Sequence, residues 1–128
     1  MSPHDRPAEI VVLIVDDEPI VRDFVQFALA RHGFRVLVAT SGYEALEIAR
    51  AFEGQIHLVL SDVKMPGMNG PQMIETIQRE RPGTKFLVMT GKSSGEIPRW
   101  LRPTTLEKPF PLKQLIQHVN SVLGRQAE

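Results

Sequence analysis

Two short aliphatic runs, each ending in aspartate, constrain the fold of this chain more than any other feature. Residues 10–15 read Ile-Val-Val-Leu-Ile-Val and lead into Asp16 and Asp17, and residues 58–61 lead into Asp62. A short apolar run bounded by turn-forming residues is typical of a strand buried on both faces of a parallel sheet. Ligands of open α/β sheets bind at the carboxyl ends of the strands, so the sequence predicts that these aspartates lie at a binding edge.

The rest of the chain alternates between strand-like and helix-like segments. Further strands are predicted at residues 34–39, 85–89 and 104–107 from their apolar, partly β-branched runs. Helices are predicted between Pro19 and Gly33, from Ser41 to about Ala51, between Gly70 and Pro82, and between Pro111 and Gly124. Five alternating units predict an α/β fold, a (βα)5 doubly wound parallel five-stranded sheet with the flavodoxin-like strand order 2-1-3-4-5.

The predicted helices carry apolar side chains at helical spacing, which we expect to face the sheet. In the first helix these are Ile20, Val21, Phe24, Phe27, Ala28 and Leu29, and in the last they are Leu112, Leu115, Ile116, Val119, Val122 and Leu123. Ser41 followed by Glu44 fits a capping box at the start of the second helix. Residues 92–103 are different, because loop-forming residues and Pro98 leave room for a turn or two of helix at Trp100 and Leu101.

Composition limits the classes of function that this chain can have. Basic and acidic residues balance at 15 each, so no net charge favours nucleic acid or a membrane surface. There are no cysteines and no long apolar run, which excludes disulfide and thiolate chemistry and fits a cytoplasmic location. We expect one complete module at residues 9–124, between a flexible tail at 1–8 and a short tail at 125–128.

Asp16, Asp17 and Asp62 are predicted to converge, because the first and third strands are neighbours in this order. Two carboxylates at about 4 Å repel by roughly 4 kcal/mol at an effective dielectric near 20, so a cation among them is expected. Oxygen ligands without His or Cys favour Mg²⁺ over a closed Ca²⁺ cage. Thr90 and Lys108 end the next two strands and would hold an anionic group on Asp62. This set of groups is suited to phosphoryl transfer to a carboxylate.

Four motifs at successive strand ends give the chain a resemblance to a known family. They are Asp16-Asp17, Asp62-x-x-Met65-Pro66-x-Met68-x-Gly70, Thr90-Gly91 and Lys108-Pro109-Phe110. Together they resemble the receiver domain of two-component response regulators, and the likeness extends from about residue 10 to residue 123. For each aspartate alone the alternative is helix capping or loop solvation. The presence of Thr90 and Lys108 favours the site.

The resemblance implies a role for each of these residues. Asp62 would accept a phosphoryl group from a sensor histidine kinase or a histidine phosphotransfer protein. Asp17, Asp62 and the backbone carbonyl of Lys64 would bind Mg²⁺, with Mn²⁺ as a substitute and Asp16 assisting. Thr90 and Lys108 would hold the phosphoryl oxygens, and the Lys108–Pro109 bond would be cis. Such a domain is not an enzyme. It signals through a downstream protein partner or a phosphorelay, without direct contact to nucleic acid or membrane.

The sequence departs from this family at the output side. Thr105 stands where the family often has an aromatic switch residue, and the segment from Thr90 to Lys108 is shorter than usual and contains Pro98 and Pro103. We therefore expect a shortened or irregular fourth helix and an altered switch. Trp100 is either a lid over the last two strands or an anchor for a partner.

Other interpretations of single residues and of the whole chain remain open at this point. Lys64 and Lys92 lie two residues after Asp62 and Thr90, where they either steer an acidic partner, alter the lifetime of the phosphoryl group or are simply solvated. The alternatives for the whole chain are a receiver-like scaffold that acts without phosphorylation and a small Mg²⁺-dependent phosphohydrolase of the haloacid-dehalogenase type. Phosphohydrolases of that type carry an Asp-x-Asp pair after the first strand, whereas Asp16 and Asp17 are adjacent in this chain.

Overall fold

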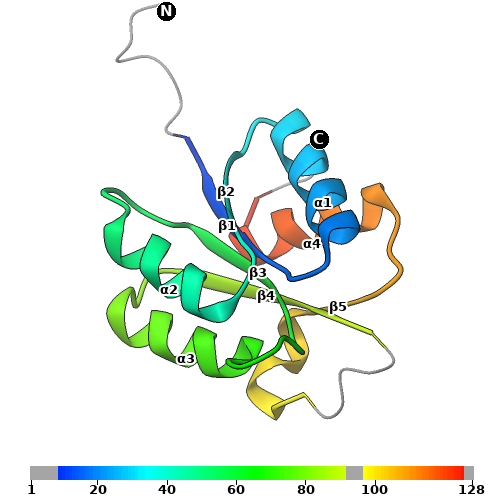
Figure 1. Ribbon diagram of the computed structural model, residues 1–128. Coiled ribbons are helices and arrows are strands. Elements are labelled where there is room, and N and C mark those ends of the chain that lie inside the picture. The colour runs from blue at the N-terminus through cyan, green and yellow to red at the C-terminus, as the bar shows by residue number, and fades with distance from the viewer. Residues whose placement is uncertain (1–8, 92–96, 126–128) are drawn as a thin grey trace, which may run out of the picture.

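The computed structural model describes residues 9–91 and 97–125, which form one parallel sheet with helices on both faces (Figure 1). The strands are β1 (Val11–Val15), β2 (Arg35–Ala39), β3 (Leu58–Asp62), β4 (Lys85–Thr90) and β5 (Thr105–Glu107). The helices are α1 (Pro19–Arg31), α2 (Gly42–Ala51), α3 (Gly70–Glu80), the 3₁₀ helix η2 (Arg99–Thr104) and α4 (Leu112–Leu123). The strand order is β2-β1-β3-β4-β5, and all pairs are parallel. The predicted fold class is confirmed.

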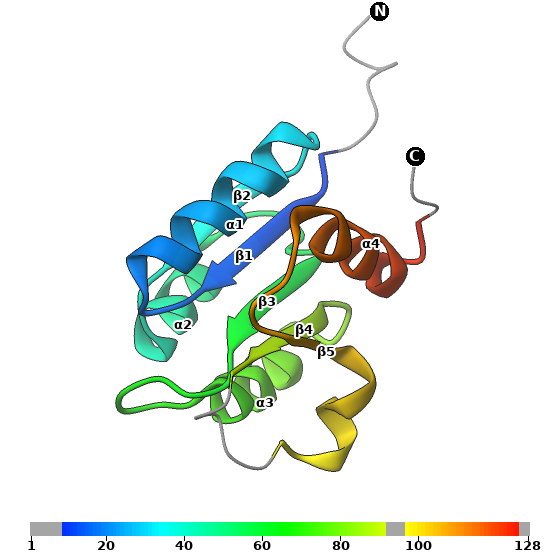
Figure 2. The same ribbon diagram turned by 90° about the vertical axis from the view of Figure 1, so that its right-hand side faces the viewer.

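The two strands that end in aspartate lie side by side in the middle of the sheet. All residues of β1 and β3 are buried, as expected for strands covered by helices on both faces. Their register pairs Val15, the last residue of β1, with Ser61, so β3 ends one residue further on, at Asp62. Helices α1 and α4 cover one face of the sheet and α2 and α3 cover the other (Figure 2). This arrangement brings Asp16 and Asp62 to one edge.

The predicted inward face of α1 is partly wrong. Val25, Ala28 and Leu29 are the buried residues of this helix. Ile20 is 85% exposed, Phe27 62% and Phe24 40%, although all three were expected in the core. The helix has apolar side chains around more than one face, and the sheet covers only one of them. Likewise, Leu112 of α4 is 41% exposed, whereas Leu115 and Val119 are buried.

Helix caps agree with the sequence at some ends and differ at others. The Ser41 hydroxyl accepts a hydrogen bond from the amide of Glu44, as predicted, at 3.1 Å. The Glu44 carboxylate accepts from the amide of Thr40 instead of Ser41, so the predicted capping box is only half formed. The complete capping box belongs to Asn69 and Gln72 at the start of α3, where none was predicted. Gly124 ends α4 in the left-handed conformation, with φ of 74°, as its position predicts.

The connection between β4 and β5 is irregular, as predicted. In its described part, residues 97–104, the helix is the six-residue 3₁₀ helix η2, which contains Pro103. The hydroxyls of Thr104 and Thr105 both donate to the carbonyl oxygen of Leu101, at 3.2 and 2.8 Å, and fasten η2 to the start of β5. Among the helices of the described residues, none combines the length and apolar character needed to cross a bilayer.

Candidate functional site

Three carboxylates meet where β1 and β3 end. One side-chain oxygen from each of Asp16, Asp17 and Asp62 lies within 4.8 Å of the others. Asp16 is fully buried and Asp62 is 5% exposed, whereas Asp17 is exposed to the cavity that opens above them. The convergence follows from the parallel register of β1 and β3: Val15 pairs with Ser61, so Asp16, directly after β1, lies level with Asp62, the last residue of β3. The residues predicted to bind a metal are therefore neighbours.

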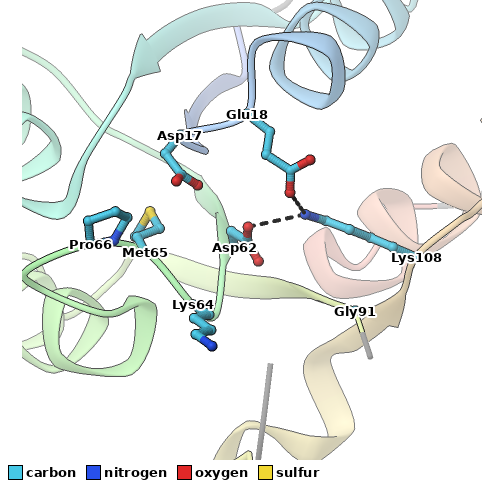
Figure 3. Close-up of a pocket in the computed structure, with 8 residues that line it drawn as sticks. All are labelled: Asp17, Glu18, Asp62, Lys64, Met65, Pro66, Gly91 and Lys108. Carbon is cyan, nitrogen blue, oxygen red and sulfur yellow. Dashed lines mark hydrogen bonds and ion pairs between the residues drawn. The ribbon is translucent and has the colours of Figure 1, made fainter. Parts of the chain in front are cut away.

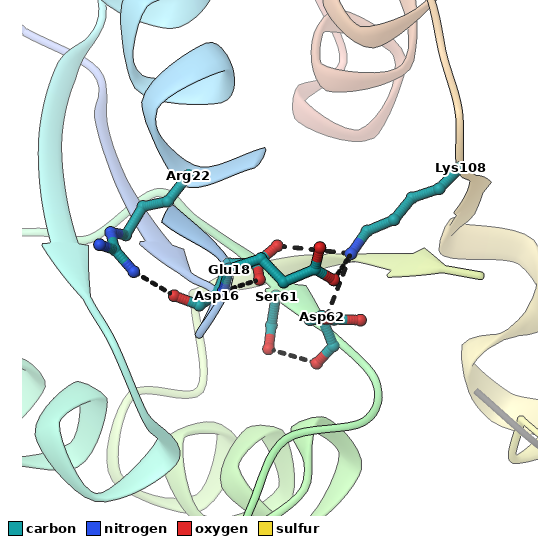
Figure 4. Close-up of polar contacts among 6 residues, drawn as sticks. All are labelled: Asp16, Glu18, Arg22, Ser61, Asp62 and Lys108. Atoms are coloured by element: carbon teal, nitrogen blue, oxygen red, sulfur yellow. Dashed lines mark hydrogen bonds and ion pairs between the residues drawn. The ribbon is translucent and has the colours of Figure 1, made fainter. Parts of the chain in front are cut away.

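Lys108 reaches this cluster from the end of β5. Its Nζ lies 3.1 Å from Oδ2 of Asp62, 3.5 Å from Oδ2 of Asp16 and 3.6 Å from Oε1 of Glu18 (Figures 3 and 4). The Lys108 amide donates to the carbonyl oxygen of Thr90 at 2.6 Å, and the following peptide bond to Pro109 is cis. Lys108 thus lies over Asp62, where it meets any anionic group attached to that carboxylate.

Burial and charge act in opposite directions on the acidic groups. Burial raises the pKa of Asp16, and the amide of Glu18 and the ammonium of Lys108 oppose this effect only in part. Burial also raises the pKa of Asp62 against the charge of Lys108, and the nearby charge of Asp17 adds to the rise. Burial alone would lower the pKa of Lys108, but Asp16 and Asp62 outweigh it and raise the pKa. One lysine does not balance the negative charge of this cluster.

The cluster forms the floor of a cavity of about 370 Å³ (Figure 3). Its lining comes from the segments at the ends of four strands, β1, β3, β4 and β5: Asp17, Glu18, Asp62, Lys64, Met65, Pro66, Gly91 and Lys108. The Lys64 side chain is exposed at the rim, and Met65 is buried against the core. Thr90 is buried as the last residue of β4, one position before Gly91. Lys92 lies outside the described residues.

Residues outside the predicted set hold this site in shape. The amide of Gly70 donates to the carbonyl oxygen of Val63 at 2.8 Å and closes the loop between β3 and α3. A Cβ atom at Gly70 would overlap the Asp62 carbonyl oxygen, so only glycine fits there. The sequence analysis also missed Glu18 as a partner of Lys108. Its position directly after the two aspartates was the available signal.

Trp100 and the described histidines lie apart from the cavity. Trp100 is 44% exposed and lines a separate groove together with Lys85, Phe86 and Leu101. His57 accepts a hydrogen bond from the amide of Val11 at 3.0 Å, which is a structural role. The ring nitrogens of His32 and His118 contact backbone carbonyls of their own helices. His4 lies outside the described residues.

Comparisons with known proteins agree with this geometry. The family model described as "Response regulator receiver domain" matches residues 12–120. The chain is 37% identical over 126 residues to the "Sensor kinase CckA" of Brucella abortus, covering 95% of this chain and 13% of that protein. It is 30% identical to the "Probable transcriptional regulatory protein TcrX" of Mycobacterium tuberculosis, covering 91% of this chain and 50% of that protein. It therefore spans half or less of these two curated relatives.

A solved structure gives the same result for the fold. The response regulator receiver domain protein of Clostridium thermocellum superposes with a TM-score of 0.80 at 25% identity. The match covers 90% of this chain and 94% of that one. Nearly the whole length of each chain is therefore included in the match.

Proposed function

The chain belongs to the response regulator receiver family, and from that premise we propose that Asp62 accepts a phosphoryl group from a protein phosphohistidine. The receiver unit in this proposal is residues 9–124, and it works in the cytoplasm as a signalling domain. It is phosphorylated by a sensor histidine kinase or a histidine phosphotransfer protein. The phosphorylated form then acts on a downstream protein partner or passes the phosphoryl group along a relay.

The observation that carries this proposal is the placement of Asp62. Its carboxylate lies at the base of an open cavity with Lys108 at 3.1 Å. In the transfer an Asp62 oxygen bonds to phosphorus, the phosphorus–nitrogen bond breaks, and the imidazole of the donor leaves and takes up a proton. The ammonium of Lys108 stabilises the phosphoryl oxygens as charge builds on them. Thr90 donates its hydroxyl to the same group.

The donor atoms of the cavity fit a hard divalent cation. They are carboxylate oxygens within 4.8 Å of one another, and the pKa of Asp16 and of Asp62 is raised because burial leaves their charge poorly balanced. We assign Asp17, Asp62 and the backbone carbonyl of Lys64 as ligands, with Asp16 assisting, and Mg²⁺ as the ion, replaceable by Mn²⁺. When bound, the ion neutralises charge during phosphoryl transfer.

The exposed face of α1 is suited to docking of the phosphodonor. Ile20, Phe24 and Phe27 recur at the spacing of one helix face and are all exposed. Beside them an apolar groove of about 540 Å³ is lined by Ile20, Val21, Phe24, Lys108, Pro109 and Phe110. Lys108 lines this groove and the acidic cavity alike. A donor helix packed in the groove would place its phosphohistidine next to Asp62.

The experiment that tests the proposal is intact-mass spectrometry after incubation with Mg²⁺ and acetyl phosphate. The wild-type protein is expected to gain one phosphoryl group. Asp62→Asn and wild-type protein with EDTA are expected to gain none. An adduct that persists in Asp62→Asn would refute the assignment of Asp62. A wild-type protein that gains no adduct from acetyl phosphate or from a panel of histidine kinases, while it binds Mg²⁺, would instead support the scaffold. Turnover of phosphodonors that is unaffected by Asp62→Asn would support a phosphohydrolase.

A further inference from the structure

Arg22 contacts the site through the backbone of Asp16. It is the fourth residue of α1, and its Nη1 donates a hydrogen bond of 2.9 Å to the Asp16 carbonyl oxygen (Figure 4). A positive charge near the N-terminus of a helix opposes the helix dipole. Helix formation alone therefore does not favour an arginine at this position, and the contact with the carbonyl gives it a role.

Arg22 binds the backbone carbonyl of Asp16, whereas the amide and the carboxylate of Asp16 have other partners. The Asp16 amide donates to the carbonyl of Ala39 at 3.2 Å. Its Oδ1 accepts from the amide of Glu18 at 2.9 Å, and its Oδ2 lies 3.5 Å from Lys108. The carbonyl belongs to the peptide that joins Asp16 to Asp17. Arg22 therefore fixes the plane of the peptide from which Asp17 begins.

The direction of Asp17 depends on that peptide. Asp17 is exposed, and among residues 9–91 and 97–125 its carboxylate has no hydrogen-bond donor that would orient it. Asp16 and Asp62, by contrast, are buried and have Lys108 as a partner. Within the described part of the chain, the backbone and the packing around it are therefore what bring the Asp17 oxygen within 4.8 Å of the other two.

We propose that Arg22 is a positioning residue, which orients Asp17 toward the cation site by holding the Asp16–Asp17 peptide. The inference rests on the proposed function, because it assigns Arg22 to the same cation site. It adds a residue that touches neither the cation nor the phosphoryl group.

The sign of a mutational effect separates this role from a plain charge effect. If Arg22 were only a positive charge near the acidic cluster, its removal would strengthen cation binding, because less positive charge would repel Mg²⁺. If Arg22 positions Asp17, its removal weakens binding. Residues that orient metal ligands typically contribute 10- to 100-fold in affinity, so a loss of about tenfold is expected.

The experiment measures Mg²⁺ affinity by calorimetry for wild type, Arg22→Met, Arg22→Lys and Arg31→Met. Arg22→Met is expected to bind about tenfold more weakly, and Arg22→Lys to fall between it and wild type. Arg31→Met removes a charge from the far end of the same helix and is expected to match wild type. Equal or tighter binding by Arg22→Met would overturn the proposal.

A second measurement needs no metal and so does not depend on the proposed function. In metal-free protein, hydrogen exchange of the Glu18 amide, which donates to Oδ1 of Asp16, is expected to accelerate in Arg22→Met and to stay unchanged in Arg31→Met. Unchanged exchange in Arg22→Met would refute the positioning role by itself. If wild type failed to bind Mg²⁺ while exchange accelerated as expected, the cation assignment would be wrong and the role of Arg22 in holding the peptide would stand.

Discussion

Substituting Gly70 by alanine tests how tightly the loop after Asp62 is held. The added Cβ would overlap the Asp62 carbonyl oxygen and lie 3.2 Å from the Asp62 carbonyl carbon and from Cα of Val63. These are backbone atoms, and they cannot move freely. The Val63 amide donates to Met89 at 3.2 Å, and its carbonyl accepts from Gly70 at 2.8 Å. The clash must therefore be relieved by shifting the end of β3 itself.

The expected magnitude follows from two opposing effects. Alanine in place of glycine in a helix gains up to about 1 kcal/mol, and less at the first helical residue, where Gly70 lies. Overpacking a close contact costs about 1–3 kcal/mol when the surroundings can adjust, and more when they cannot. We expect Gly70→Ala to lower the free energy of unfolding by about 2 kcal/mol and to slow phosphorylation of Asp62, because the carboxylate moves with its backbone.

Urea denaturation followed by circular dichroism measures the change in stability, and the acetyl phosphate reaction measures the effect on Asp62. The matched control is Gly83→Ala, because a Cβ atom there meets nothing within 4 Å. This control is expected to be neutral or to stabilise by about 0.4–1 kcal/mol, since alanine restricts the unfolded chain. Equal stability of the two variants would refute the reasoning, and so would normal phosphorylation of a destabilised Gly70→Ala.

Three further predictions concern the end of α2, the acidic cluster and the docking surface. Arg81→Ala removes hydrogen bonds to three carbonyls around the end of α2 and should lower the free energy of unfolding by about 2–3 kcal/mol in urea denaturation. Arg50→Ala, which breaks an exposed ion pair, is the control and should destabilise the protein clearly less. The raised pKa of Asp62 means that folded protein binds this proton more readily than unfolded protein. Asp62→Asn should therefore stabilise metal-free protein at neutral pH. The gain in melting temperature should shrink as the pH falls through the raised pKa of Asp62. A gain that grows as the pH falls would contradict this prediction. Ile20→Glu should slow phosphotransfer from a histidine kinase and leave the acetyl phosphate reaction unchanged. Gln26→Glu, at another exposed position of α1, is the control. An equal loss of rate in both reactions would contradict a docking role for Ile20.

The sheet and its acidic edge could be predicted from the sequence because each depends on short-range patterns. The apolar runs before Asp16 and Asp62 are typical of buried parallel strands, and the strand order then makes the two aspartates neighbours. The position of Glu18 directly after the two aspartates indicates that it lies near the site, but it does not identify Lys108 as the partner, and nothing in the sequence indicates the contact of Arg22 with Asp16. Both side chains are long, and which partner each one reaches depends on the exact course of the loop after β1. Sequence spacing carries no information on that course.

Helix α1 shows why the wrong part of the prediction is informative. Its apolar residues are too many for one buried face: Val25, Ala28 and Leu29 fill the contact with the sheet, and Ile20, Phe24 and Phe27 remain outside it. Periodicity identifies apolar faces but does not tell which of them the chain itself covers. Single exposed apolar side chains are common, but three on one helix face beside an apolar groove that reaches Lys108 form a continuous surface. Burial of that surface by a phosphodonor would stabilise the complex and not the isolated fold, so the residues that the core prediction misplaced are those expected to select the donor.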